Sequence, residues 1–412
     1  MRHLRKPMCT LGRDKGRARA SVSVRAWLLL VSLHAVKPSN VNPSQYLATQ
    51  VSPPQYSAAS TWADHRHLSN FEALRRAAAD TWEYLPTHFN SSFKNPCWVT
   101  HEDGHLHCLP YFQILGVSKC GTTDLYHRLA QHPDVVDCKW KGPHFWDEAP
   151  YPIRRAKDPT KYDGSFQAYV AIFDKPAQLI ALDPARRITG EASSNTFTAV
   201  LTYLRGPIRA KQLGTPVTLA QYLWEAAPWS RFVVMMRDPV MRYYSAYFYY
   251  RSKRSEPGTP QDFHQRAVKD TAVWATCLNA QGEVDCLARY QPQQLVKGLY
   301  AGYLPAWWAV WPRERLLLLR TEDYKAAPQE HLQAVSHFLG LRALSDSEAV
   351  RVVAAKRRNA KSYAAMLPET RDMLQDFYRP WNERLSRMLG NDSRWLWGYG
   401  VSEVVNGQRA AC

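Results

Sequence analysis

The chain has 412 residues, of which 45% are hydrophobic, and a formal net charge of +17 at pH 7. This length and apolar content suffice for one large core or two smaller ones, and no repeat or long low-complexity tract indicates a fibrous or disordered protein. The positive charge suits polyanionic partners, although a merely solvated basic surface explains any single charge run equally well. The chain has no zinc-finger, RNP-type or helix-turn-helix pattern, so we expect no nucleic-acid partner.

The first 36 residues predict a basic tail and a short signal segment. Residues 1–25 hold eight Lys or Arg against the single Asp14, and Ala26–Val36 is an apolar run. The run is long enough for a signal-peptide core but shorter than the roughly 20 residues that span a bilayer. A cleaved signal peptide and a short signal anchor in the membrane both fit. Residues 37–89 begin with Pro-, Ser- and Gln-rich sequence, which predicts a stem or linker.

Cysteine usage indicates an oxidising compartment. Cys97 with Cys108, and Cys277 with Cys286, form two close pairs that flank turn-like sequence. Each pair predicts a hairpin-like loop closed by a disulfide. The chain has no CxxC motif and no Cys/His cluster at zinc spacing, so we expect no metal site.

Two glycosylation sequons point to the same compartment. They begin at Asn90 and Asn391. Such triplets also arise by chance, but a glycosylated, disulfide-bonded chain with a signal segment belongs in the lumen of the secretory pathway.

A strand, a tight loop and a helix follow one another at residues 111–131. Tyr111–Val117 is an apolar run of strand length, Gly116 and Gly121 allow the backbone to turn, and Thr122 begins a helix. Backbone N–H groups in such a loop, together with the positive end of the helix, form a phosphate cradle. Lys119 adds a movable positive charge inside the loop.

This loop differs from the Walker A loop of ATPases and GTPases. In Walker A, a lysine directly follows the second glycine, whereas here Thr122 occupies that position and Lys119 lies inside the loop. A P-loop nucleotide kinase would also need Mg²⁺ ligands, and none are evident. The loop therefore predicts phosphate binding but argues against a kinase.

Further strands and helices alternate after the loop and predict an α/β fold: a single P-loop-like domain with a central parallel sheet flanked by helices on both faces. The predicted strands are Val135–Trp140, Arg187–Ala192, Arg231–Met236 and Arg315–Arg320. The predicted helices are Thr122–Gln131, Leu219–Ala226, Met241–Tyr250, Gln293–Trp311, Gln329–Leu339 and Glu369–Leu389. Ligands bind such sheets beyond the carboxyl ends of the strands.

The end of the Arg231–Met236 strand predicts a second phosphate site. Arg237 follows the strand, Pro239 begins a helix, and Ser245 lies two turns along it. An arginine fork and a hydroxyl together can bind a phosphate. The alternative is an Arg–Asp surface pair that caps the helix. Two phosphate sites in one domain require a ligand with phosphates at both ends.

With these motifs, the chain resembles the Golgi-type carbohydrate sulfotransferases, which use 3′-phosphoadenosine 5′-phosphosulfate (PAPS), and is most similar to the N-acetylgalactosamine 4-sulfate 6-O-sulfotransferase group. The resemblance covers about residues 90–398 and predicts a sulfotransferase domain at 90–400, followed by a tail at 401–412. It runs through Asn95-Pro-Cys-Trp98, Cys108-Leu-Pro-Tyr-Phe112, the loop at Lys119, Phe338-Leu-Gly-Leu341 and Phe377-Tyr-Arg-Pro-Trp-Asn382.

The resemblance implies roles for individual residues. The 5′-phosphosulfate would be bound by Lys119, Cys120, Gly121, Thr122 and Thr123. The 3′-phosphate would be bound by Arg237 and Ser245. The basic segment 356–361 resembles the late loop that closes over the nucleotide, with Arg358 and Lys361 as its ligands. Lys119 would also stabilise the leaving phosphate, and Cys120 itself is interpreted as a small packed residue because transfer from PAPS needs no covalent intermediate.

The chain departs from the family at the general base. Relatives commonly read Lys-Glu-Pro-His, with Glu proposed as base, whereas this chain reads Lys141-Gly-Pro-His144. Three interpretations stay open. His144 acts as base, oriented or replaced by Asp147 or Glu148; catalysis is lost and the protein binds PAPS or glycan without turnover; or Glu191, at a strand end, is the base.

The resemblance implies the class of glycan that accepts the sulfuryl group, but not the individual glycan. We expect an anionic glycan, sulfated or rich in uronic acid, sulfated in the Golgi lumen. Basic residues either line a trough for this glycan or are solvated loop charges: Arg154, Arg155, Lys157, Lys161, Arg251, Lys253 and Arg254. The sugar, the position sulfated and the oligomeric state do not follow from the sequence.

Overall fold

The structure is a computed structural model that describes residues 78–100, 104–138, 140–147, 164–202, 217–354 and 363–399, with residues 72, 74 and 75 of a preceding helical stretch. These residues belong to one compact unit. The predicted signal segment and C-terminal tail, most of the predicted stem, Glu148, Arg358 and Lys361 lie outside the described residues, as do the basic residues at 154–161. Within the described ranges, no helix is long and apolar enough to cross a bilayer.

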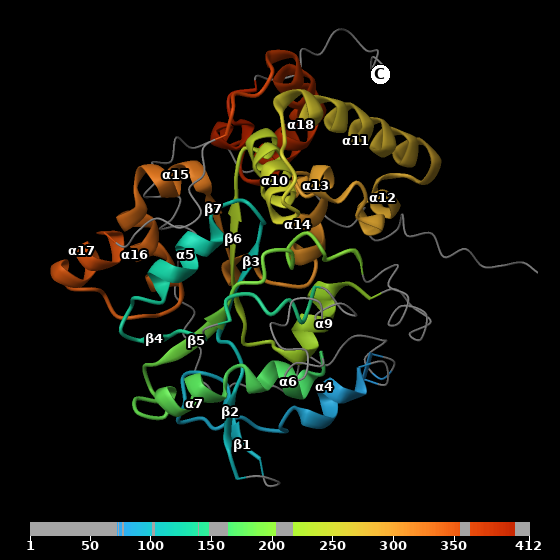
Figure 1. Ribbon diagram of the computed structural model, residues 1–412. Helices are drawn as coiled ribbons and strands as arrows, with labels where there is room; N and C mark the ends of the chain where they lie inside the picture. Colours follow the sequence, from blue (N-terminus) through green and yellow to red (C-terminus); the bar gives the residue numbers. More distant parts are fainter. Residues whose placement is uncertain are drawn as a thin grey trace, which may run out of the picture. The chain divides into compact units, whose positions relative to one another are not determined.

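A five-stranded sheet forms the centre of the unit, with its strands in the order β4-β5-β3-β6-β7 (Figure 1). Every neighbouring pair is parallel. The strands are β3 (Phe112–Gly116), β4 (Val135–Val136), β5 (Ile188–Glu191), β6 (Arg231–Met236) and β7 (Leu316–Arg320). Their nearly continuous apolar sequence suits strands that are buried on both faces. The predicted α/β fold is confirmed.

Helices cover both faces of this sheet (Figure 1). One face carries α5 (Thr122–Leu129) and α16 (Pro328–Phe338), and the other carries α9 (Leu219–Ala226) and α14 (Tyr300–Trp308). On the second face, the ring of Phe232 packs against Trp307 and Trp311, with centroids 5.4 and 4.6 Å apart. Both tryptophans are fully buried, so they are core residues and not a platform for sugars.

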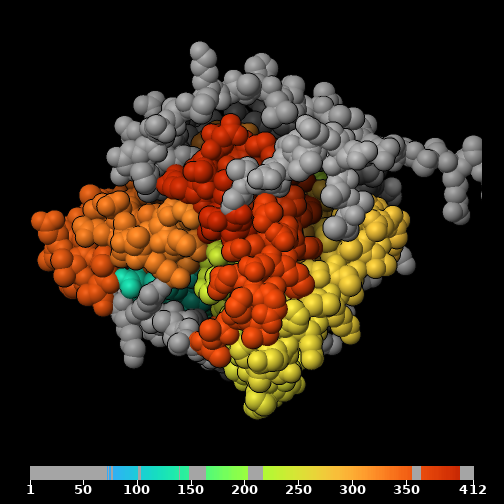
Figure 2. Space-filling view, turned by 90° about the horizontal axis from the view of Figure 1, so that it is seen from above, coloured from blue at the N-terminus to red at the C-terminus, as the bar shows by residue number. Residues whose placement is uncertain are grey.

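The carboxyl ends of the strands meet α10 (Pro239–Lys253), α11 (Pro260–Gln281) and α18 (Pro368–Met388) (Figure 1). Seen from this end, α18 and α11 form much of the surface, beside the orange helices α15 (Thr321–Ala326), α16 and α17 (Asp346–Ala354) (Figure 2). The two predicted phosphate-binding turns follow strands that end toward this face, since β3 ends at Gly116 and β6 ends at Met236.

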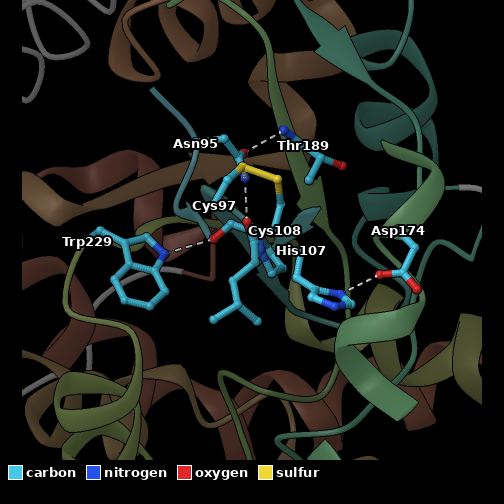
Figure 3. Close-up of a disulfide and its surroundings, with 9 residues drawn as sticks. Asn95, Cys97, His107, Cys108, Asp174, Thr189 and Trp229 are labelled. Atoms are coloured by element: carbon cyan, nitrogen blue, oxygen red, sulfur yellow. Dashed lines mark hydrogen bonds and ion pairs between the residues drawn. A yellow bond between two sulfur atoms is a disulfide. The ribbon is translucent and has the colours of Figure 1, made fainter. Parts of the chain in front are cut away.

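A disulfide-closed hairpin lies at the opposite end of the sheet, near α4 (Ala79–Tyr84), α6 (Phe166–Ala171) and α7 (Asp174–Ile180) (Figure 1). Its antiparallel strands, β1 (Cys97–Val99) and β2 (Leu106–Cys108), pair Cys97 with Cys108, as predicted. The amide of Asn95 accepts from the backbone of Thr189 in β5 and donates to the backbone of Leu109 (Figure 3). The hairpin is thus fixed to the sheet.

The second predicted disulfide joins Cys277 to Cys286, but it does not close a hairpin-like loop of extended sequence. It spans the corner between α11 and α12 (Glu283–Arg289), where Gly282 turns the chain with φ +81°. The prediction of a turn before Gly282 was wrong because residues 279–281 are still in the last turn of α11. A glycine at this position is typical of a helix end.

The predicted helix Gln293–Trp311 is also wrong. The structure has α13 (Gln293–Val296) and then α14, with a break at Gly298. A Cβ on Gly298 would lie 2.8 Å from the ring of Tyr378 and 2.9 Å from the Cβ of Pro239. The helix is interrupted where α18 and the start of α10 closely approach its backbone. Hydrophobic periodicity in the sequence does not reveal such an approach.

Both sequons are at the surface of the unit. Asn90 is exposed, and its amide oxygen accepts from the backbone and the hydroxyl of Ser92. Asn391 is exposed in the turn after α18. Both are accessible to a glycosylating enzyme, and their modification stays a prediction.

Candidate functional site

The first predicted phosphate site is a left-handed turn between β3 and α5. Gly116, Lys119 and Gly121 all have positive φ, of +142°, +72° and +92°. A Cβ on Gly116 would lie 2.7 Å from the carbonyl oxygen of Ser194, so only glycine fits there. Gly121 is the N-cap of α5, whose first N–H groups have no partners within the helix and carry its positive end. Positive φ at a lysine is uncommon and marks a position under structural constraint.

Neighbouring strands hold this loop in place. The hydroxyl of Thr321, at the end of β7, lies 2.6 Å from the carbonyl oxygen of Cys120 and 2.9 Å from that of Met236. Burial raises the pKa of the Cys120 thiol to about 11, so the thiol is neutral at physiological pH. Cys120 is a packed residue of the loop, as its sequence context predicts. The hydroxyl of Ser118 is buried without a hydrogen-bond partner among the described residues.

The second predicted phosphate site lies directly beside the first. The Nη1 of Arg237 donates to the backbone carbonyl of Lys119 at 3.4 Å. Asp238 caps α10 by accepting from the backbone N–H groups of Val240 and Met241 at 2.9 and 3.2 Å. Ser245 is buried two turns along the same helix. The ends of β3 and β6 thus bring the two predicted sites together.

An open pocket of about 420 Å³ adjoins Arg237. Its walls come from the ends of β6 and β7 and from the segment around η4 (Ser393–Leu396), which the sequence did not place near the site. Its basic side chains are Arg237, Arg320, Lys325 and Arg394. Trp397 donates its indole N–H to Glu322 at 3.0 Å and closes one wall. A basic pocket with an aromatic wall suits an anionic ring compound such as a nucleotide.

Two hydrogen-bond partners orient His144. Its Nδ1 lies 2.9 Å from Oδ1 of Asp147, and its backbone N–H donates to the hydroxyl of Ser193 at 2.9 Å. The side chain of Asp147 is fully buried and also accepts from Thr196 at 3.1 Å. His144 itself has φ +59°. The Nε2 of the ring lies 3.4 Å from the place where a Cβ on Gly142 would be.

Glu191, the other candidate base, is buried beneath the site. Its Oε2 accepts from the hydroxyl of Ser193 at 2.5 Å, and its Oε1 has no hydrogen-bond partner among the described residues. Burial raises the pKa of this carboxyl to about 8. Because the side chain is fully buried, it does not reach an acceptor in this arrangement. Through Ser193 it is connected to the backbone of His144.

Lys141 is a site residue to which the sequence analysis gave no role. Its Nζ donates to the carbonyl of Ala192 at 3.0 Å and lies 3.5 Å from the hydroxyl of Thr122. Burial lowers the pKa of this ammonium to about 8. Thr122 is the first residue of α5, so Lys141 connects the Gly142–His144 segment to the phosphate loop. Its position directly before Gly142 was the available signal.

Comparison with known proteins identifies the family. The family model for the sulfotransferase domain matches residues 110–373. The chain belongs to the sulfotransferase family. It is 30% identical to human (Homo sapiens) carbohydrate sulfotransferase 15 over 80% of this chain and 59% of that protein, and 30% identical to the Rattus norvegicus protein of the same name over 81% and 70%. It spans less than two thirds of the human relative.

The comparisons also found more distant similarities. The chain is 24% identical to the bifunctional heparan sulfate N-deacetylase/N-sulfotransferase 4 of Mus musculus, over 75% of this chain and 34% of that protein. Among solved structures, a sulfotransferase from Alicyclobacillus acidocaldarius is 23% identical, covering 70% of this chain and 98% of its own, with a TM-score of 0.48. The predicted family is confirmed, and the P-loop kinase alternative is dropped.

Proposed function

We propose that the protein transfers a sulfuryl group from PAPS to a hydroxyl group of a glycan. The observation that carries this proposal is the contact between Arg237 and the backbone of Lys119. It brings two phosphate-binding turns side by side, and PAPS has a phosphate at its 3′ position and a phosphosulfate at its 5′ position. In this assignment Lys119–Thr123 bind the phosphosulfate, and Arg237 and Ser245 bind the 3′-phosphate.

The proposed reaction is an in-line displacement at sulfur. The acceptor oxygen forms a bond to sulfur while the bond between sulfur and the 5′-phosphate oxygen breaks, which yields a sulfate ester and 3′-phosphoadenosine 5′-phosphate. Lys119 and the positive end of α5 stabilise the charge that builds on the leaving phosphate. His144 takes the acceptor proton, because Asp147 orients its ring and leaves Nε2 for proton transfer.

The acceptor that we propose is an anionic glycan, sulfated or containing uronic acid. The names of the relatives, carbohydrate sulfotransferase and heparan sulfate N-sulfotransferase, support a glycan. Exposed cations at the end of α10, Lys253 and Arg254, offer charge for such a polymer. The two disulfides support a place in the secretory lumen, and we propose the Golgi.

Transfer of radiolabelled sulfate from PAPS to a broad panel of glycans tests this function. We expect transfer to an anionic glycan, and we expect Lys119→Ala to reduce it at least a hundredfold while the exposed Lys269→Ala on α11 retains it. Absence of transfer to every glycan, with 3′-phosphoadenosine 5′-phosphate still bound, would defeat the proposal.

That outcome would favour the second candidate function, a relative that binds PAPS or glycan without turnover. The observation behind it is Gly142, which has no proton acceptor where relatives commonly carry Glu. The oriented His144 next to Gly142 favours turnover over this alternative.

A further inference from the structure

We propose that Lys141, beside the start of α5, is a second cationic ligand of the donor's 5′-phosphosulfate in addition to Lys119. This inference rests on the proposed function, because it assumes that PAPS binds at the phosphate loop. Lys119 enters the site from the loop itself, whereas Lys141 enters from the segment after β4. Two cations on different elements would share the negative charge of the leaving phosphate.

The position of the ammonium carries the proposal. Its Nζ lies 3.5 Å from the hydroxyl of Thr122, the first residue of α5. An anion bound by the first N–H groups of α5 therefore lies within reach of Lys141. The ammonium has three N–H donors, of which the carbonyl of Ala192 accepts one at 3.0 Å and the hydroxyl of Thr122 accepts a second, longer one at 3.5 Å. A bound phosphosulfate would accept from the remainder.

The surroundings of Lys141 leave its charge largely uncompensated. The titratable groups that face it are Glu191, on β5, and Cys138, in the segment after β4. Burial raises the pKa of Glu191 to about 8 and that of Cys138 to about 12, so both are mainly protonated at neutral pH. A partly buried cation whose neighbours are neutral is costly to maintain unless an anion is bound. A phosphosulfate supplies that anion.

The ammonium of Lys119 lies against a different element from the ammonium of Lys141. Its Nζ lies 3.9 Å from the ring centroid of Tyr249, on α10, which is the helix of the second phosphate site. Lys141 instead lies beside Ala192 and Thr122. The two lysines therefore approach the loop from different elements and are not interchangeable contacts of one ion.

Binding of two nucleotides by calorimetry tests the assignment without any need for turnover. 3′-Phosphoadenosine 5′-phosphate has both phosphates, whereas adenosine 3′-monophosphate lacks the 5′-phosphate. At pH 7 we expect Lys141→Gln to lower the affinity for 3′-phosphoadenosine 5′-phosphate about tenfold. The affinity for adenosine 3′-monophosphate should stay unchanged. Arg237→Gln should lower the affinity for both nucleotides. Substitution of the exposed Lys269 on α11, Lys269→Gln, should lower neither affinity.

The pH dependence of binding gives a second test. Because the pKa of Lys141 lies near 8, the wild-type protein should lose affinity for 3′-phosphoadenosine 5′-phosphate as pH rises from 7 to 9. Lys141→Arg keeps its charge over this range, so its curve should be shallower than that of the wild type, with deprotonation of Glu191, whose pKa is about 8, as the remaining contribution. The comparison of wild type with Lys141→Arg tests whether Lys141 binds the 5′-phosphosulfate even if Lys141→Gln fails to fold.

Two results would overturn the assignment. One is a folded Lys141→Gln protein that prefers the 5′-phosphorylated nucleotide as strongly as the wild type does. Lys141 would then only connect Ala192 to α5 and would not bind the donor. The other is an identical pH curve for the wild type and Lys141→Arg. A wild-type protein that binds 3′-phosphoadenosine 5′-phosphate but transfers no sulfate would defeat the proposed function alone, and the binding test of Lys141 would stand.

Discussion

Oδ1 of Asp147 lies 2.9 Å from Nδ1 of His144 and fixes the imidazole beside Gly142. This contact favours the tautomer or ion that carries hydrogen on Nδ1, which leaves Nε2 as the nitrogen for proton transfer. Nε2 also lies 3.4 Å from the place that a Cβ on Gly142 would take. A proton acceptor is therefore present next to the position where relatives commonly carry Glu.

His144→Asn should lower kcat by a factor of about 10² to 10⁴, the usual contribution of a general base, and leave the affinity for 3′-phosphoadenosine 5′-phosphate unchanged. Steady-state transfer assays and calorimetry measure the two effects. Asp147→Asn should lower kcat less, because the imidazole remains in place but loses the carboxylate that orients it. Full activity of His144→Asn would remove His144 as the base.

Gly142→Glu should lower activity in the wild-type background. The new Cβ would lie 3.0 Å from the carbonyl oxygen of Ala192, which has to move slightly, and 3.4 Å from the Nε2 of His144, so the new carboxylate would enter beside the imidazole. In a His144→Ala background the ring is absent, and we expect Gly142→Glu to restore part of the lost transfer. Gly142→Ala is the matched control, because it adds the Cβ without a carboxylate. Higher activity of the single Gly142→Glu variant would show that the missing Glu limits this enzyme.

Glu191→Gln should change how stability depends on pH. The pKa of Glu191 is raised in the folded protein from 4.5 to about 8, so the unfolded chain releases this proton at lower pH than the folded protein does. Wild-type stability therefore falls as pH rises from about 5 to 7.5, whereas Gln has no proton to release. We expect the stability of the wild type to decline relative to Glu191→Gln by roughly 2–5 kcal/mol over this range, measured by urea unfolding. Parallel curves for the two proteins would contradict the raised pKa.

The sheet was predictable from the sequence because its strands are short apolar runs with turn residues at their ends. Arg231–Met236 was predicted with its observed bounds. The strand at Val135 is shorter than predicted because the backbone N–H of Cys138 donates to the hydroxyl of Tyr126 on α5 and leaves the sheet. Contacts of this kind join residues that are adjacent only in the folded chain, so a local pattern does not show them.

Helix α11 was missed although its signals were present. Thr259 and Asp262 form a capping box, and Pro260 is the first helical residue. Its mostly polar sequence lacks the wide apolar stripe that the helix predictions relied on, since only Phe263, Ala267, Asp270 and Trp274 are buried. Capping signals identify such a helix where hydrophobic periodicity does not.

The two turns at the ends of β3 and β6 were predictable from glycine, lysine and arginine at strand ends, and their binding of phosphate stays a prediction. Lys141 and the pocket wall at Trp397 were not predicted. Their roles depend on burial and on approach across the sheet edge, and a single lysine or tryptophan in a sequence carries no such information.

The segment after α18 should support binding of the 3′-phosphate, since it holds the turn that carries Arg237. The hydroxyl of Tyr399 donates to Oδ1 of Asp238, the same oxygen that caps α10. Glu322 accepts from the backbone of Asp238 at 3.1 Å and from Trp397 at 3.0 Å. Loss of one hydrogen bond to a carboxylate costs about 1–3 kcal/mol, of which only part is transmitted to the ligand.

We therefore expect Tyr399→Phe to lower the affinities for adenosine 3′-monophosphate and 3′-phosphoadenosine 5′-phosphate equally, by about three- to tenfold. The KM for the glycan should stay unchanged. Equal weakening separates this variant from one at Lys141, which should affect only the 5′-phosphorylated nucleotide. Calorimetry with both nucleotides and a transfer assay at saturating PAPS measure these quantities. If Tyr399→Phe binds both nucleotides as the wild type does, α10 is capped well enough by Asp238 alone, and the C-terminal segment has no part in donor binding.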